Sequence, residues 1–411
     1  MFDSPKIRRF FRRELDELTM HRHTFSPLLS LVGCHIVARI VDDPSVDVVE
    51  ITDFQEGFGD MNEKAVHWNT LEVGHEVTAQ YMTSAYVFAR HRALDDLKLL
   101  VVLAPASDGL AVSVVIRAED HDRMPALLDW IEELESTDHP LKGRLFSVTT
   151  SSLDFMPAQG VTRDDVVVPR TLLDEIERNF AFLDQPEAYP PALRHRALLL
   201  AGPPGVGKTL IAKWLSGRFD CTGLWTTPGA VWELGPASIF SLARQLRPTL
   251  LILEDLDVAA GDRRGNQPLG DLLGQLDGFT DLEGVAVLAT TNHPEVLDHA
   301  LDPDRRPGRF HRLLRIAPPN DEGRRTMLRR LVLRSEVLPD LPRPALERLV
   351  VLADGATGAA ITELVHDLEI RLLWRERWET GVEIESVVDE LEEDRLGGAC
   401  HCLGFVSRES A

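Results

Sequence analysis

The chain has 411 residues and a formal net charge of −22, from 66 Asp and Glu against 44 Lys and Arg. This length allows two or three domains with their own cores. The acidic excess argues against a general nucleic-acid-binding protein, because a phosphate backbone attracts clustered Lys and Arg, but it leaves a local basic channel open.

Cysteine content and hydropathy predict a cytoplasmic protein. Four cysteines are too few for a disulfide scaffold, so a reducing compartment is expected. No apolar run approaches the roughly 18–20 residues needed to cross a bilayer, and we therefore predict no transmembrane segment. The amino terminus mixes basic and acidic residues without an apolar core, so we expect neither a signal peptide nor a transit peptide.

Residues 1–160 are predicted to form an α+β domain. Apolar spacing and turn residues predict a helix over 4–19, a β-hairpin with a longish loop from strands 97–103 and 110–116, a helix over 121–134 and a strand over 143–148. The histidines are scattered without the spacing of a metal site. We expect this domain to bind a partner or substrate.

Residues 161–318 are predicted to form a doubly wound α/β domain. Pro157, Gly160 and the polar residues around them predict a domain boundary. Beyond this boundary, helices alternate with short, very apolar strands. We expect strands at 197–201, 223–226, 249–253 and 285–290. Runs of this kind are buried on both faces of a parallel sheet, with helical crossovers between them.

The remainder of the chain is predicted to be helical. Residues 319–396 carry expected helices at 321–333, 344–352, 358–378 and 383–391. Residues 397–411 are expected to form a flexible tail.

A glycine-rich octet follows the first of these strands and precedes a helix beginning at Leu210. Its sequence is Gly202-Pro203-Pro204-Gly205-Val206-Gly207-Lys208-Thr209, which matches G-x-x-x-x-G-K-[ST]. Glycines let backbone N–H groups converge on a phosphate, and the helix N-terminus adds partial positive charge. The lysine side chain can span the β- and γ-phosphates, and the threonine hydroxyl can bind Mg²⁺. The octet and Leu210 are therefore predicted to bind ATP.

Two adjacent carboxylates end the strand at 249–253. We expect Glu254 to support the hydration shell of Mg²⁺, together with Thr209, and Asp255 to orient or deprotonate the attacking water. Asn292 follows the strand at 285–290, where a neutral amide can hold the γ-phosphate and the water. Arg309 and Arg312 lie in an arginine-rich loop that could reach the γ-phosphate of a neighbouring subunit.

Residues from about 166 to 375 resemble the AAA family of ring-forming ATPases. The resemblance is carried by GPPGVGKT, LILEDLD, LLGQLDGF, ATTNHPEVLDHAL, RPGRF and DGATGAAITEL. It implies that Asn292 is sensor 1, that Arg309 and Arg312 are arginine fingers acting in trans, and that Gly358 and Ala359 meet the nucleotide from a helical lid. It also implies a homo-oligomer, expected to be a hexamer.

The order of the two carboxylates departs from most of the family, which reads Asp-Glu where this chain reads Glu254-Asp255. This order, with the segments IERNFAFLDQPEAY and TTNH, resembles the Bcs-type branch of mitochondrial chaperones. Those members carry an amino-terminal transmembrane helix, which is not expected here, so their membrane location and assembly role are not carried over. Glu254 in the metal position is one methylene longer than Asp, and Asp255 in the base position is one methylene shorter than Glu. Both carboxylates are still present, and we expect activity.

Trp232 aligns with the pore-loop aromatic of many family members. A ring of tryptophans could grip an extended polypeptide by apolar contact, although a tryptophan buried under the ring surface explains the residue equally well. Residues 261–267 align with a second pore loop that holds two arginines. A basic ring there keeps a nucleic-acid substrate open, although none is expected.

Three functions follow from these features. The favoured one is an ATP-hydrolysing ring that remodels or translocates a protein recruited by residues 1–160. The swapped carboxylates also allow a nucleotide-gated scaffold with little turnover, which a phosphate-release assay would separate from the first. A nucleic-acid remodeller is the third, and salt-sensitive stimulation by DNA or RNA would favour it.

Overall fold

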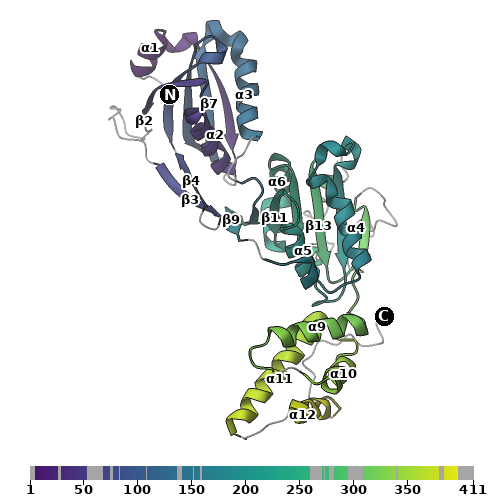
Figure 1. Cartoon of the computed structure of the whole chain (residues 1–411). Helices are drawn as coiled ribbons and strands as arrows, with labels where there is room; N and C mark the ends of the chain where they lie inside the picture. Colours follow the sequence, from purple (N-terminus) through teal and green to yellow (C-terminus); the bar gives the residue numbers. More distant parts are fainter. Residues whose placement is uncertain are drawn as a thin grey trace. The chain divides into compact units, whose positions relative to one another are not determined.

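The structure of the protein is a computed structural model (Figure 1). It describes residues 5–25, 29–52, 68–74, 77–82, 84–107, 109–136, 141–150, 152–157, 160–259, 271–272, 274–276, 282–294, 309–338, 341–378 and 384–396. The chain divides into two compact units, Met1–Pro157 and Ala158–Ala411. The domain boundaries given above stay predictions, and the tail at 397–411 lies outside the described residues.

The first unit is built around an antiparallel sheet. Its elements are α1 (Pro5–Phe11), β1 (Leu18–Phe25), α2 (Ser30–Asp42), β2 (Val46–Thr52), β3 (Trp68–Gly74), β4 (Val77–Met82), β5 (Ala85–His91), β6 (Leu97–Ala106), β7 (Gly109–Arg117), α3 (Met124–Ser136), β8 (Leu145–Val148) and β9 (Leu153–Met156). The main sheet has the order β1-β7-β6-β5-β2, while β3–β4 and β8–β9 pair as antiparallel hairpins. Helix α2 packs against β6 and β7 and against α3 (Figure 1).

The first expected helix and the first expected hairpin differ from the structure. Helix α1 ends at Phe11, and residues 18–25 form β1, because pairing with β7 along its whole length overrides the helical spacing. Ile7 and Phe11 of α1 are buried against sheet side chains. The hairpin is confirmed, but its loop is short, since β6 and β7 stay paired as far as Ala106 and Gly109.

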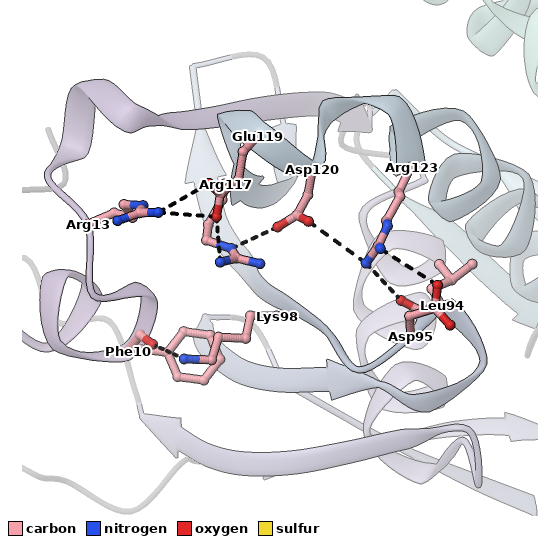
Figure 2. Close-up of polar contacts among 9 residues, drawn as sticks. All are labelled: Phe10, Arg13, Leu94, Asp95, Lys98, Arg117, Glu119, Asp120 and Arg123. Carbon is pink, nitrogen blue, oxygen red and sulfur yellow. Dashed lines mark hydrogen bonds and ion pairs between the residues drawn. The ribbon is translucent and has the colours of Figure 1, made fainter.

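A chain of ion pairs joins the segment after α1 to the 3-10 helix that follows β7 (Figure 2). The Nε of Arg117 donates to Oδ2 of Asp120 at 2.8 Å, and Arg13 Nη2 donates to Oε2 of Glu119 at 3.1 Å. Arg13 and Glu119 are largely exposed, so we expect each such pair to add less than about 1 kcal/mol. These contacts orient the amino-terminal segment on the sheet.

The second unit contains a parallel sheet and a helical carboxyl-terminal region. Its elements are α4 (Arg170–Phe180), β10 (His195–Ala201), α5 (Lys208–Ser216), β11 (Thr222–Thr226), α6 (Pro228–Gln245), β12 (Thr249–Leu253), α7 (Leu256–Ala259), β13 (Val285–Thr291), β14 (Arg312–Arg315), α9 (Asp321–Arg334), α10 (Arg343–Leu352), α11 (Gly358–Trp378) and α12 (Ile384–Leu396). The strands lie in the order β14-β10-β13-β12-β11 and run parallel. The predicted fold class is confirmed: an α/β domain with a parallel sheet precedes a helical carboxyl-terminal region, and the amino-terminal part, predicted as α+β, is rich in strands.

Burial explains why the strand predictions succeed. Every residue of β11, β12 and β13 is buried, as expected for strands covered on both faces. Strand β12 has the predicted bounds, whereas β10, β11 and β13 are each longer than predicted. The carboxyl ends of β10, β12 and β13 lie side by side, with Ala201 opposite Thr291 and Leu253 opposite Ala289.

Helices α9 to α12 have their own hydrophobic core. Leu328 of α9, Leu349 of α10, Ile361 of α11 and Val387 of α12 are buried in one cluster. Helix α11 has the predicted bounds, and α12 continues to Leu396 instead of ending at 391. Within the described ranges, no helix is long and apolar enough to span a bilayer.

Candidate nucleotide-binding site

The glycine-rich loop connects the carboxyl end of β10 to the first turn of α5. A Cβ on Gly202 would lie 2.3 Å from the carbonyl oxygen of Ile316, so only glycine fits between the loop and the chain after β14. Gly207, which precedes α5, has φ +100° and no atom within 4 Å of an added Cβ. The loop is therefore packed at its first glycine and open at its third, which lies at the N-terminus of α5.

Lys208 points into the mouth of this loop. Its Nζ donates to the carbonyl oxygens of Gly202 (2.7 Å) and Pro203 (3.0 Å) and to Oδ1 of Asn292 (2.7 Å). The residue is only 6% exposed, and this burial lowers the pKa of Lys208, while the carboxylates of Asp255 and Asp257 oppose the shift. The ammonium is thus placed where it can exchange neutral oxygens for phosphate oxygens.

Glu254 links the end of β12 to α5 and β11. Its Oε1 accepts a hydrogen bond from Thr209 Oγ1 at 2.9 Å, and its Oε2 accepts one from Trp225 Nε1 at 2.9 Å. The predicted metal residues Thr209 and Glu254 are therefore in direct contact. Hydroxyl and carboxylate oxygens are the donors that Mg²⁺ prefers.

Asp255 is held beside Asn292. Asn292 Nδ2 donates to Asp255 Oδ1 at 3.0 Å, and the backbone N–H of Asp255 donates to Thr290 Oγ1 at 3.0 Å. Asp255 has φ +44°, a left-handed conformation that Asp adopts more readily than most residues. The same Asn292 contacts Lys208, so the amide joins the predicted base to the phosphate loop.

Asp257 holds the other side of Asn292. Its Oδ1 accepts from Thr291 Oγ1 at 2.7 Å and from the backbone N–H of Asn292 at 3.1 Å. This carboxylate fixes the turn that carries the amide.

The start of α11 lies against the phosphate loop. The N–H of Ala359 donates to the carbonyl oxygen of Gly205 at 3.0 Å. A Cβ on Gly205 would lie 2.8 Å from Cβ of Ala359 and 2.9 Å from Oγ1 of Thr357, and one on Gly358 would lie 3.2 Å from the Gly205 oxygen. The predicted residues Gly358 and Ala359 are thus brought to the loop, which needs small residues at this contact.

The two arginines at β14 differ in exposure. Arg309 is buried at 7% exposure, whereas the side chain of Arg312 is 65% exposed and lies 3.6 Å from Glu175 of α4. Arg312 pairs with Leu198, three residues before the end of β10. At about 3.3 Å per residue, this register places Arg312 roughly 10 Å along the sheet from the phosphate loop of its own chain.

Comparison with known proteins decides the family of this region. Residues 198–318 match the family described as "ATPase family associated with various cellular activities (AAA)". They form an AAA ATPase domain. The matched range begins within β10 and ends after β14, so it contains the loop, both carboxylates and Asn292.

The AAA domain is homologous to those of FtsH-type proteins. The chain is 34% identical over 226 residues to ATP-dependent zinc metalloprotease FtsH 1 of Petrotoga mobilis, covering 50% of this chain and 34% of the relative. It is 35% identical over 219 residues to the ATP-dependent zinc metalloprotease YME1 homolog of Schistosoma mansoni, covering 49% and 32%. It therefore spans about a third of the length of these relatives. In the described part of this chain, no group of three His, Cys, Asp or Glu residues is placed to hold a metal ion.

Trp232 lies in the first turns of α6, and its side chain is exposed at 57%. Exposure in a single chain does not test the alternative of a tryptophan buried under the ring surface, which stays a prediction. The role of Trp232 at a pore also stays a prediction. The second predicted pore loop, 261–267, and the motif residues 277–281 and 295–308 lie outside the described residues.

Sequence analysis missed Trp225, Thr290 and Asp257 of this site. Asp257 is the third acidic residue of the LILEDLD motif, and its position in that motif could have indicated a role in the site. No local sequence pattern indicates Trp225 or Thr290. Trp225 bonds to a residue 29 positions away, and Thr290 to one 35 positions away, at the end of a neighbouring strand of the sheet.

ATP and Mg²⁺ fit the residues of the AAA domain. Gly207 leaves the loop open at the helix N-terminus, and Lys208 brings a buried cation to the same mouth. Thr209 and Glu254 offer oxygen donors beside it, which is a donor set suited to a hard divalent cation.

Proposed function

We propose that the chain hydrolyses ATP to ADP and phosphate at this site. The observation that carries the proposal is the meeting of Lys208, Asn292 and Asp255 at the carboxyl ends of adjacent strands, with Lys208 Nζ and Asp255 Oδ1 both bonded to one amide. This arrangement puts a cation for the phosphates, a neutral amide and a carboxylate base in one connected group.

Each side chain has a step in the reaction. The loop from Gly202 to Leu210 binds the β-phosphate through the backbone N–H groups that follow its two prolines, and Lys208 moves from its carbonyl partners to the γ-phosphate. Thr209 and Glu254 would hold Mg²⁺, which would supply positive charge beside the phosphate oxygens. Asp255 accepts a proton from the water whose oxygen attacks the γ-phosphorus, while the bond from that phosphorus to the bridging oxygen breaks and ADP leaves.

The lid and a neighbouring subunit complete the site. Gly358 and Ala359 contact the nucleotide from α11, since α11 already touches the loop at Gly205. Arg312 acts on the γ-phosphate of an adjoining copy, because it is exposed and set back from its own loop. Arg309 is buried and joins it only if the interface reorders this segment. A closed homo-oligomer, proposed as a hexamer, follows from this use of a neighbour.

The ring is proposed to remodel or translocate a protein bound by the amino-terminal unit. The exposed side chain of Trp232 supports this, since large apolar side chains in aqueous surroundings favour contact with a polypeptide. The matched relatives are named as proteases, which act on proteins. Stimulation of phosphate release by an unfolded protein supports this substrate class, and salt-sensitive stimulation by DNA or RNA contradicts it.

The order Glu254-Asp255 supports two finer proposals. It relates the chain to the Bcs-type branch within the AAA family. It also keeps open a nucleotide-gated scaffold with little turnover, which the burial of Arg309 favours. A phosphate-release rate at the level of the buffer blank, in protein that binds ATP, would select the scaffold.

Binding by the loop is tested with Lys208→Ala against Lys213→Ala, a substitution on the same helix outside the loop. Lys208→Ala abolishes binding of a fluorescent ATP analogue, because the buried cation at the mouth is lost. Lys213→Ala keeps wild-type affinity. Wild-type affinity in Lys208→Ala contradicts the proposed site.

A further inference from the structure

Trp225 is the penultimate residue of β11, and its indole points to the metal-binding side chain of the site. The residue is 5% exposed, and its Nε1–H donates to Oε2 of Glu254 at 2.9 Å. The backbone is tied at the same place, since the N–H of Glu254 donates to the carbonyl oxygen of Thr226 at 3.1 Å. The end of β11 therefore holds both the main chain and the carboxylate of Glu254.

Both carboxylate oxygens of Glu254 are held, each from a different element. Thr209 of α5 donates to Oε1 and Trp225 of β11 donates to Oε2. Glu has one more rotatable bond than Asp, and fixing it costs conformational entropy. A carboxylate accepts about four hydrogen bonds, so two donors leave lone pairs for metal-bound water.

We propose that Trp225 is a positioning residue that fixes the longer Glu254 side chain for Mg²⁺ binding. This inference rests on the proposed function, because it assigns Glu254 to the metal. The indole N–H donates and cannot accept, and a bond to a carboxylate is charge-assisted. It selects the side-chain conformation in which the second oxygen meets Thr209, and thereby compensates for the additional methylene of Glu at this position.

A purely structural role makes a different prediction. Buried indole N–H groups usually find an acceptor, and Trp225 would then only fill the space beside β12. In that case removal of the N–H changes stability without changing how Mg²⁺ affects nucleotide binding. In the positioning role, the metal-dependent part of the affinity changes and the metal-free part does not.

The test compares Trp225→Phe with Trp214→Phe in the full chain. Trp214 lies on α5, five residues after Thr209, at 4% exposure, and its replacement by Phe removes the same ring volume. Affinity for a fluorescent, slowly hydrolysed ATP analogue is measured in EDTA and in Mg²⁺. Trp225→Phe lowers the Mg²⁺-dependent gain in affinity about tenfold, the effect of one charge-assisted hydrogen bond, and leaves the EDTA value unchanged. Trp214→Phe changes neither value.

A second variant keeps the test decisive if Trp225→Phe folds poorly. Glu254→Asp shortens only the carboxylate and takes it out of reach of the indole, so it loses the same metal-dependent gain. A full Mg²⁺-dependent gain in Glu254→Asp contradicts the inference without any change at Trp225. Where Trp225→Phe folds, the double variant loses no more than either single variant, because the two side chains act as a unit.

Besides the absence of any effect of Trp225→Phe or of Glu254→Asp, three further results overturn the inference. They are an equal loss in Trp214→Phe, a loss of EDTA affinity in Trp225→Phe, and additive losses in the double variant. If the wild-type chain itself fails to bind the nucleotide, the proposed function fails and this inference fails with it. Wild-type binding with no effect of Trp225→Phe refutes only the positioning role.

Discussion

Substitution of Gly205 by Ala is expected to separate the phosphate loop from the helical lid. Gly205 has φ +81°, and an added Cβ would lie 2.8 Å from Cβ of Ala359 and 2.9 Å from Oγ1 of Thr357. Thr357 is 4% exposed, and Ala359 is tied to the loop by its backbone N–H, so neither can easily move away. In Gly205→Ala, therefore, either the loop moves away from Thr357 and Ala359 or the backbone around residue 205 is strained.

Gly207→Ala is the matched control for this change. Gly207 also has a positive φ, at +100°, but an added Cβ meets nothing within 4 Å. Both substitutions lower the free energy of unfolding by about 1–2 kcal/mol, because Ala must adopt a left-handed conformation. Only Gly205→Ala loses about 1–3 kcal/mol more, because its Cβ overpacks the contact. The difference between the two variants therefore isolates the contact with the lid.

The free energy of unfolding is measured by urea titration without nucleotide, since both glycines line the loop. Hydrogen exchange at the N–H of Ala359 localises the effect, and this amide exchanges faster only in Gly205→Ala. Adding Ala359→Gly to Gly205→Ala restores part of the lost stability, because it removes the closest clashing atom. Equal losses in Gly205→Ala and Gly207→Ala would refute the loop–lid contact.

Two further predictions concern pH and the neighbouring subunit. Burial lowers the pKa of His195 and of His311 to about 4, and neutral His311 Nδ1 accepts from the N–H of Ala197 at 3.0 Å. Between pH 6.5 and 4 the unfolded chain binds more protons, so stability falls as pH drops through this window, by up to about 3 kcal/mol for buried His195. Urea unfolding midpoints at pH 7.5 and 5.5 measure this loss of stability, and His195→Gln makes it smaller. A wild-type midpoint that does not fall at pH 5.5 contradicts the prediction. Separately, Arg312→Ala and Asp255→Asn are each inactive alone but recover phosphate release when mixed, and no recovery excludes action of Arg312 in trans.

Much of the AAA domain could be predicted because its signals are local. The run 249–253 lies between Pro248 and Glu254, and its bounds match β12. Strand β1 was missed because its LTMHRHTF sequence is polar and exposed, as an edge strand allows, and only pairing with β7 makes it a strand. The bond from Trp225 to Glu254 was also missed, because it depends on which strands are neighbours in the sheet.

The central claim, ATP hydrolysis with Asp255 as the base, is tested most directly by phosphate release from Mg²⁺-ATP. Wild-type chain and Asp255→Asn are compared, and binding of a fluorescent ATP analogue is measured on the same samples. Asn keeps the size of the side chain but cannot take the proton. The account predicts turnover in the wild type and, in Asp255→Asn, wild-type binding with turnover lost. Full turnover in Asp255→Asn contradicts it.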